Sequence, residues 1–196
     1  MGAVHLPPLA ELVLALKSRF GISDFVETGT FQGDATAWAA QNFERVWTIE
    51  IRADYQAQAR QRTGEPPNVR FLLGNSAEKL TEVCVELGAP AIFWLDAHAG
   101  AGFFGTEDNC PLIDEIDVIT RGPRQHFLLI DDARAFYAPP PPPFDYRKWP
   151  SLEVVMRHLA AHHDYHVVLL KDCLICVPQA ARELIAEFAF QVRPKI

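Results

Sequence analysis

The sequence predicts an α/β fold in which a mostly parallel sheet of seven strands carries helices on both faces. Short apolar runs alternate along the chain with amphipathic runs at helical spacing. The run at 91–95 is apolar throughout, which is typical of a central parallel strand covered on both faces. Near the end, Lys171 and Asp172 leave only a short turn between two strand-like runs, so the sheet must close with an antiparallel hairpin.

We expect one domain over residues 1–196, since this length suits a single core. An amphipathic helix is expected within residues 1–21, ended by Gly21. The strands are expected at 24–28, 45–50, 69–73, 91–95, 126–130, 165–170 and 173–177. The remaining helices are expected at 34–43, 52–62, 77–87 and 111–119, from 151 onward, and after Pro178.

The composition excludes some classes of protein. The net charge is −7 and no basic cluster stands out, which argues against nucleic acid as a partner. No apolar run approaches the ~20 residues that a membrane span needs. The first residues lack the basic region, apolar core and cleavage site of a signal peptide. We therefore expect a cytoplasmic protein without a membrane partner.

The stretch 24–33 holds the strongest functional signal. A strand runs into Glu27, then Gly29, three spacers beginning with Thr30, and Gly33, and a helix follows at once. Such a turn offers backbone N–H groups and a helix N-terminus to a ligand. Gly29 allows a tight turn and a close approach to the backbone. We expect Gly33 to let the following helix lie close to the strand.

A second acid narrows the type of ligand. Glu50 ends the next strand, and one carboxylate there can accept hydrogen bonds from both hydroxyls of a ribose. Two cofactor classes fit, nicotinamide dinucleotides and S-adenosylmethionine. The dinucleotide fingerprint is G-x-G-x-x-G, but here an acid precedes the first glycine and no third glycine admits a pyrophosphate. The acid suits a cationic ligand end, such as the amino group of a methionine.

These two motifs resemble those of the class I S-adenosylmethionine-dependent methyltransferases, E/D-x-G-x-x-x-G and the acid that ends strand two. The resemblance covers about residues 22–178 and implies a Rossmann-like methyltransferase sheet of seven strands. It implies that the cofactor is held by Glu27, Gly29, Thr30, Gly33, Glu50, Asn75, Ser76 and Asp96. The family often has Gly-Asp-Ala where this chain has Gly74-Asn75-Ser76. Asn75 either accepts from the adenine amino group or caps the next helix.

The runs FWLDAH and LIDDAR are similar to a little-characterised bacterial branch of that family. They also resemble the metal-dependent O-methyltransferases, which place one Asp after strand four and an acidic pair after strand five. Asp96, Asp131 and Asp132 occupy those positions, so the resemblance implies a site for Mg²⁺ or Mn²⁺. In the alternative, Asp131 caps the loop, Asp132 pairs with Arg134, and Asp96 alone contacts the cofactor or acceptor.

The catalytic base does not carry over from those enzymes, because their lysine falls at Ala99. His98, two residues past Asp96, is a candidate base, since an imidazole titrates near neutral pH. Its alternative is a polar loop residue. Two segments are expected to border the acceptor pocket as loops, the glycine-rich 99–109 and 133–149 with its five consecutive prolines.

The sequence therefore predicts methyl transfer from S-adenosylmethionine to an oxygen of a small molecule, such as a sugar, a phenol or a polyketide. The expected partner is that acceptor, and a homodimer is compatible with the prediction. Three alternatives stay open. They are a metal-independent N-methyltransferase, a non-catalytic S-adenosylmethionine-binding protein and an NAD-dependent oxidoreductase.

Overall fold

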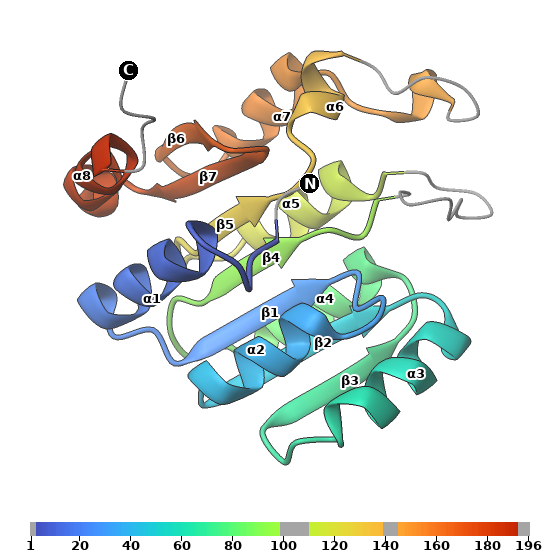
Figure 1. Ribbon diagram of the computed structural model, residues 1–196. Helices are drawn as coiled ribbons and strands as arrows, with labels where there is room; N and C mark the ends of the chain where they lie inside the picture. Colours follow the sequence, from blue (N-terminus) through green and yellow to red (C-terminus); the bar gives the residue numbers. More distant parts are fainter. Residues whose placement is uncertain (1–2, 99–109, 139–144, 192–196) are drawn as a thin grey trace.

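A computed structural model describes residues 3–98, 110–138 and 145–191, and within them the chain forms one sheet of seven strands (Figure 1). The strands are β1 Asp24–Thr28, β2 Arg45–Glu50, β3 Val69–Leu73, β4 Ile92–Leu95, β5 Phe127–Ile130, β6 Tyr165–Leu170 and β7 Cys173–Pro178. Their order across the sheet is β3-β2-β1-β4-β5-β7-β6. All seven predicted strands are confirmed, with bounds that differ by one residue at most.

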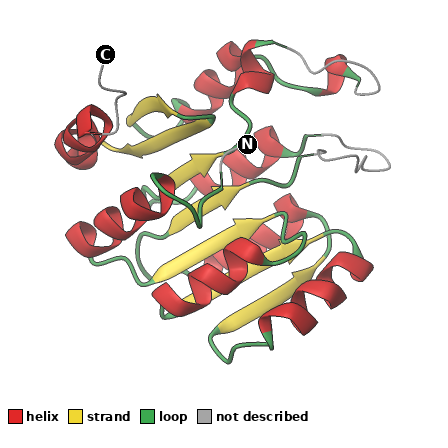
Figure 2. Ribbon diagram, in the orientation of Figure 1, coloured by secondary structure: helices red, strands yellow, loops and turns green. Residues whose placement is uncertain are grey.

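Helices connect the strands and cover the sheet (Figure 2). They are α1 Leu9–Phe20, α2 Asp34–Asn42, α3 Ala53–Thr63, α4 Ser76–Glu86, α5 Leu112–Thr120, α6 Arg134–Tyr137, α7 Leu152–Leu159 and α8 Arg182–Gln191. Short 3-10 turns lie at Tyr146–Lys148 and Gln179–Ala181. None of the helices in the described ranges is long and apolar enough to cross a membrane.

The pairing of the strands explains how the hairpin closes the sheet. Strand β1 pairs in parallel with β2 and β4. On the outer sides, β3 pairs in parallel with β2, and β5 pairs in parallel with β4. Strand β7 is antiparallel both to β5 and to β6, so the predicted antiparallel hairpin is confirmed. The sequence did not predict that β7 would insert between β5 and β6, because a short turn fixes only the pairing of its own two strands.

Two hydrophobic cores lie on opposite faces of the sheet. Phe93 and Leu95 pack on the face covered by α4, α5 and α7. Ile92 and Trp94 pack on the other face, which α1, α2 and α8 cover. Strand β4 is thus buried on both sides, which confirms the prediction from its continuous apolar run.

The alternation of side chains places several acids on one face. Along a strand, every second residue points to the same side. Glu27 follows Phe25 at this spacing, Glu50 follows Thr48, and Asp96 follows Trp94. These carboxylates therefore project toward the α1 and α2 face, at the edge where β1, β2 and β4 end.

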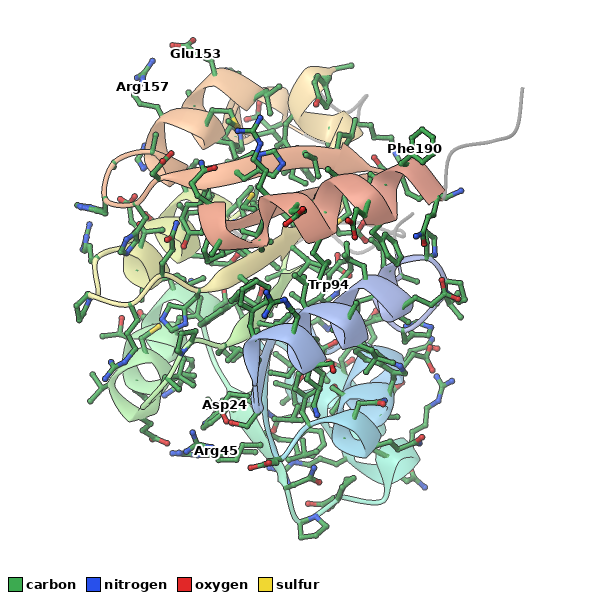
Figure 3. All side chains as sticks on the ribbon, turned by 90° about the vertical axis from the view of Figure 1, so that its left-hand side faces the viewer. Asp24, Arg45, Trp94, Glu153, Arg157 and Phe190 are labelled. Carbon is green, nitrogen blue, oxygen red and sulfur yellow. The ribbon has the colours of Figure 1, made fainter. Side chains whose placement is uncertain are left out.

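The opposite edge of the sheet carries structural ion pairs. The buried Asp24, at the start of β1, accepts hydrogen bonds from Nε of Arg45 at 2.8 Å and from Nη2 at 2.5 Å. Figure 3 shows this pair side by side, with Trp94 enclosed between α1 and the sheet. Both Asp24 and Arg45 are first residues of their strands, so the pair fixes the register of β1 against β2.

The expected loop at 133–149 contains short helical elements where the structure describes it. The helical turn α6 lies before residues 139–144, and a 3-10 turn lies after them. The expectations for 99–109 and for the proline run lie outside the described residues.

Candidate functional site

The turn that follows β1, called the β1 turn here, holds Gly29 and Gly33, and each glycine is required for a different reason. Gly29 has φ +83°, and a Cβ added there would lie 2.3 Å from the backbone carbonyl oxygen of Asp96. The β1 turn and the end of β4 therefore touch at a point where only glycine fits. Gly33 has φ +80°, and its added Cβ would lie 3.1 Å from Cβ of Ala59 in α3. The expectation that Gly33 brings α2 close to its strand was wrong, because it makes room for α3.

The backbone N–H groups of this turn donate inside the protein. The N–H groups of Gly29 and Thr30 both donate to the Ile49 carbonyl, at 2.9 and 3.3 Å. The Phe31 N–H donates to Oε2 of Glu50 at 2.9 Å. The Gly33 N–H donates to the Thr30 carbonyl at 2.8 Å. These four N–H groups therefore have acceptors inside the protein, whereas the expectation that the N-terminus of α2 serves a ligand stays a prediction. A pyrophosphate would find these donors occupied, and Asp34 in the first turn of α2 would repel it. Both facts weigh against a nicotinamide dinucleotide.

Glu27 lies in a buried network of hydroxyl groups. Its Oε2 accepts hydrogen bonds from the hydroxyls of Thr36 and Thr48, the latter at 2.7 Å. Thr30 joins the network through Thr48, with 2.5 Å between the two hydroxyl oxygens. Burial raises the pKa of Glu27 to about 7, although the two hydroxyls lower it in part. The side chain of Thr30 faces inward, so the expectation that it binds a cofactor finds no support in its position.

Glu50 is fixed at the end of β2 by two backbone donors. Its Oε2 accepts from the Phe31 N–H and its Oε1 from the Arg52 N–H, each at 2.9 Å. Each carboxylate oxygen has two lone pairs, so one on each oxygen stays available to a further donor. Because both contacts come from the backbone, the carboxylate is held beside the Gly29 turn before any ligand arrives.

Exposed apolar side chains surround Glu50. Phe31, Ile51 and Leu73 are all exposed, although each is a large hydrophobic residue. Leu73 lies opposite Glu50 in the β2–β3 register, and Ile51 follows Glu50 directly. Phe31 holds φ +46°, an unfavourable conformation for a non-glycine residue, and its ring lies 5.0 Å from that of Tyr55. Strain and exposed apolar surface beside an oriented acid are typical of a ligand site.

Asn75 caps a helix. Its Oδ1 accepts from the Glu78 N–H at 3.2 Å, at the N-terminus of α4. The alternative in which Asn75 caps the helix is thus confirmed. Its contact with adenine, and that of the buried Ser76 beside it, stay predictions.

Asp96 and His98 follow β4 and differ in exposure. His98 Nδ1 lies 3.7 Å from Asp96 Oδ1, and the side chains are 4% and 36% exposed, respectively. His98 Nε2 lies 3.3 Å from the carbonyl oxygen of Asp131. The ring of Trp149 lies 5.3 Å from the imidazole, so one end of the segment 133–149 packs on this site. Asp96 is therefore the member of the pair that faces solvent.

The electrostatic environment of Asp96 is unfavourable to charge. Desolvation by the surrounding protein raises the pKa of its carboxyl group well above the usual range, and the charges of Asp131 and Asp132 raise it further. The Trp94 side chain, two residues earlier, donates a hydrogen bond that lowers the pKa in part. Asp96 thus carries a proton much more readily than an ordinary aspartate.

The three predicted metal ligands do not form a metal site. Asp131 is buried, while Asp132 turns its carboxylate to Arg134, with 3.0 Å between Oδ1 and Nη2. Across the residues that the structure describes, no group of three or more His, Cys, Asp or Glu side chains is arranged to hold a metal ion. The pairing of Asp132 with Arg134 is confirmed, which is one part of the alternative, while the capping of the loop by Asp131 stays a prediction. The described residues do not support the expected three-aspartate site, because Arg134 occupies the carboxylate of Asp132.

Comparison with solved structures identifies the fold. The O-methyltransferase TomG from Streptomyces achromogenes, solved with SAM, is 19% identical, covers 88% of this chain and 81% of its own, and has a TM-score of 0.60. An O-methyltransferase from Bacillus cereus, solved with SAH, is 18% identical, with coverage of 90% and 84% and a TM-score of 0.59. This chain has a methyltransferase fold.

An enzyme named for methyl transfer to nitrogen also has a similar fold. The N-methyltransferase NodS from Bradyrhizobium japonicum is 19% identical, covers 87% of this chain and 94% of its own, and has a TM-score of 0.51. No protein-family model and no curated protein sequence matches the chain. The methyltransferase fold is therefore shared by enzymes that differ in the atom they methylate.

Within this methyltransferase fold, the structure brings some predicted residues together and adds others. Glu27, Gly29, Glu50 and Asp96 all lie around the β1 turn at one edge of the sheet. Sequence reasoning missed Phe31, Thr36, Thr48 and Trp149. One signal was readable, since Thr48 precedes Glu50 by two residues and so shares its face. The others depend on tertiary contacts.

Proposed function

We propose that this protein transfers a methyl group from S-adenosylmethionine to a hydroxyl oxygen of a small molecule. The observation that carries the proposal is Glu50, whose carboxylate is clamped by two backbone N–H groups beside the Gly29 turn. An acid held in this way suits a ribose diol, and the four N–H groups of the turn that donate within the protein leave fewer donors for a pyrophosphate.

The residues present fit the parts of this cofactor. Glu50 accepts from the ribose hydroxyls, and the exposed Phe31, Ile51 and Leu73 offer apolar surface to the adenine. Glu27 is the partner for the amino group of the methionine moiety, and that positive charge favours the ionised form of its carboxyl group. When bound, the cofactor would supply a methyl group on a positively charged sulfur, and that sulfur is the leaving group when the acceptor oxygen attacks the methyl carbon in line.

Asp96 is the group that receives the acceptor's proton in this proposal. It is the exposed member of the pair with His98, and its surroundings raise its affinity for a proton, so its carboxylate form is a stronger base than that of an ordinary aspartate. His98 is a positioning residue: its ring is buried against Trp149, and its Nδ1 faces the carboxylate. This assignment differs from the expectation that His98 itself is the base.

Binding experiments test the cofactor. Calorimetry with S-adenosylmethionine, its demethylated product and NAD should give micromolar affinity for the first two alone. Glu50→Ala should lose ~2–3 kcal/mol of binding free energy, on the order of two hydrogen bonds to a charged group. Glu86→Ala is the matched control, because Glu86 pairs with Arg70 at the far end of α4. Tight binding of NAD, or equal affinity in Glu50→Ala, would refute the proposal.

Product analysis tests the acceptor. The protein is incubated with S-adenosylmethionine carrying a labelled methyl group and a panel of phenols, sugars and amines. A labelled methyl ether supports oxygen transfer, whereas a labelled methylamine favours the N-methyltransferase alternative. Cofactor binding without any labelled product across such panels would favour a non-catalytic binding protein.

A further inference from the structure

We infer that the guanidinium of Arg134 is the fixed cation of this site, and that methyl transfer here needs no divalent metal ion. The second half of the inference rests on the proposed function. The role of Arg134 as a fixed cation follows from its contacts with Asp132, two residues earlier, and with Asp172 in the β6–β7 turn.

Arg134 joins the end of β5 to the β6–β7 turn. Its Nη2 lies 3.0 Å from Oδ1 of Asp132, and its Nη1 forms an ion pair with Oδ2 of Asp172. Its backbone N–H donates to Oδ1 of Asp172 at 2.9 Å. Both oxygens of Asp172 and one of Asp132 are therefore engaged by a single arginine.

The backbone holds Asp132 in this arrangement. Asp132 has φ +49°, which is unfavourable for a residue other than glycine and persists only where neighbours enforce it. The N–H of Ala133 donates to the Asp172 carbonyl at 2.9 Å, and the N–H of Ala135 donates to the Asp132 carbonyl at 2.9 Å. The turn is thus fixed from both sides, with the Asp132 carboxylate directed at Arg134.

A metal ion would have to overcome several costs at once. It would have to displace the guanidinium of Arg134 from the carboxylate of Asp132. The third acid, Asp131, is buried, with its own carbonyl 3.3 Å from His98. Mg²⁺ demands near-octahedral oxygen ligands, and with Asp132 paired to Arg134 the described residues do not gather three acids around one point. Arg134 meets the need for positive charge without those costs.

Manganese binding tests the inference without any need for an acceptor. Mn²⁺ titrations followed by electron paramagnetic resonance are made on the wild-type protein, Arg134→Met and Arg134→Lys. Arg134 is 62% exposed, so these variants should fold, and thermal unfolding checks that they do. Arg157→Met is the matched control: Arg157 is 68% exposed and pairs with Glu153 on the outer side of α7 (Figure 3).

The wild-type protein, Arg134→Lys and Arg157→Met should bind Mn²⁺ weakly and alike. Arg134→Met should bind it at least about tenfold tighter, because removing the guanidinium leaves Asp132 and Asp172 as adjacent like charges. Adding Asp132→Ala should abolish that gain. Tight Mn²⁺ binding by the wild-type protein that Asp132→Ala removes would overturn the inference, and so would no gain in Arg134→Met.

Cofactor binding separates this inference from the proposed function. Calorimetry with the demethylated cofactor, in the same samples with and without a chelator, should give equal affinities. If the cofactor does not bind at all, the proposed function fails while the Mn²⁺ result still decides the role of Arg134. If the cofactor binds and labelled product forms only with added metal, the inference fails while the proposed function stands.

Discussion

The Nδ1 atom of His98 lies 3.7 Å from Oδ1 of Asp96, and solvent reaches the carboxylate but hardly the ring. The other ring nitrogen, Nε2, faces the backbone carbonyl of Asp131 at 3.3 Å. A carbonyl oxygen can only accept, so Nε2 must carry a hydrogen. The pair is therefore ordered by a backbone contact on its buried side, and Asp96 is presented on its open side.

The tautomer of His98 is the first prediction. When the His98 ring is neutral, Nε2 should be protonated and Nδ1 should carry the lone pair that faces Asp96. Long-range nitrogen–proton NMR on protein labelled at histidine distinguishes the two tautomers. Finding Nδ1 protonated and Nε2 bare in neutral His98 would contradict the arrangement, because the lone pair would then face the carbonyl oxygen.

The two residues should differ in their effect on turnover. Asp96→Asn removes the proton acceptor and should lower kcat by about 10²–10⁴-fold. His98→Asn removes a positioning contact and should lower kcat less. Affinity for the demethylated cofactor serves as the control and should change little in both. A larger loss of kcat in His98→Asn than in Asp96→Asn would favour His98 as the base instead.

Much of the fold was predictable because its signals are local. The strands 24–28, 45–50, 69–73 and 165–170 begin and end where the apolar pattern predicts. The insertion of β7 between β5 and β6 was not predictable, because it depends on the packing of the hairpin against the rest of the sheet. The helical turn α6 was missed, since four residues give no detectable periodicity.

The site was predictable in its acids and not in their partners. Glu27 and Glu50 stand at strand ends, which spacing reveals. The sequence did not show that Thr36 and Thr48 bind Glu27, since those hydroxyls come from a helix and a separate strand. Nor did it decide between a metal ion and Arg134 as the partner of Asp132, because both readings fit the same residues.

The close approach of Gly29 to Asp96 gives a third prediction. Gly29→Ala should destabilise the protein by several kcal/mol, because the new Cβ meets the Asp96 carbonyl and φ is positive. Gly64→Ala is the control: φ is +71°, but its Cβ would meet no described atom within 4 Å. It should lose only about 1 kcal/mol. Equal losses in urea denaturation would show that backbone conformation alone, and not the contact, requires Gly29.

The buried Glu27 gives a fourth prediction, on pH. Its pKa rises from 4.5 in the unfolded chain to about 7 in the folded protein, so the folded state holds the proton more tightly. Its contribution to stability is full below pH 4.5 and is lost as the pH rises to about 7. Glu27→Gln keeps an acceptor for both threonines and removes this dependence. Compared with the wild type, its stability should rise from pH 4.5 to 8 by on the order of 3 kcal/mol.

His126 should act in the opposite direction, which is the fifth prediction. It is buried and accepts the Ala91 N–H on Nδ1 at 3.1 Å. Burial first, and then the charges of Arg124 and His163, together lower its pKa from 6.5 to about 4. The folded state disfavours the charged ring, so this contribution is full above pH 6.5 and is lost as the pH falls to about 4. His126→Asn keeps an acceptor for Ala91 and removes the titration.

The two groups should largely cancel between pH 4.5 and 6.5 in the wild type, since Glu27 stabilises and His126 destabilises on acidification. Urea denaturation across this range isolates each one by difference. Glu27→Gln should lose stability on acidification relative to the wild type, and His126→Asn should gain it, each by on the order of 3 kcal/mol. Because surface carboxylates are common to all three proteins, their titration drops out of the comparison. Identical pH profiles for the two variants would mean that neither group titrates as its burial requires.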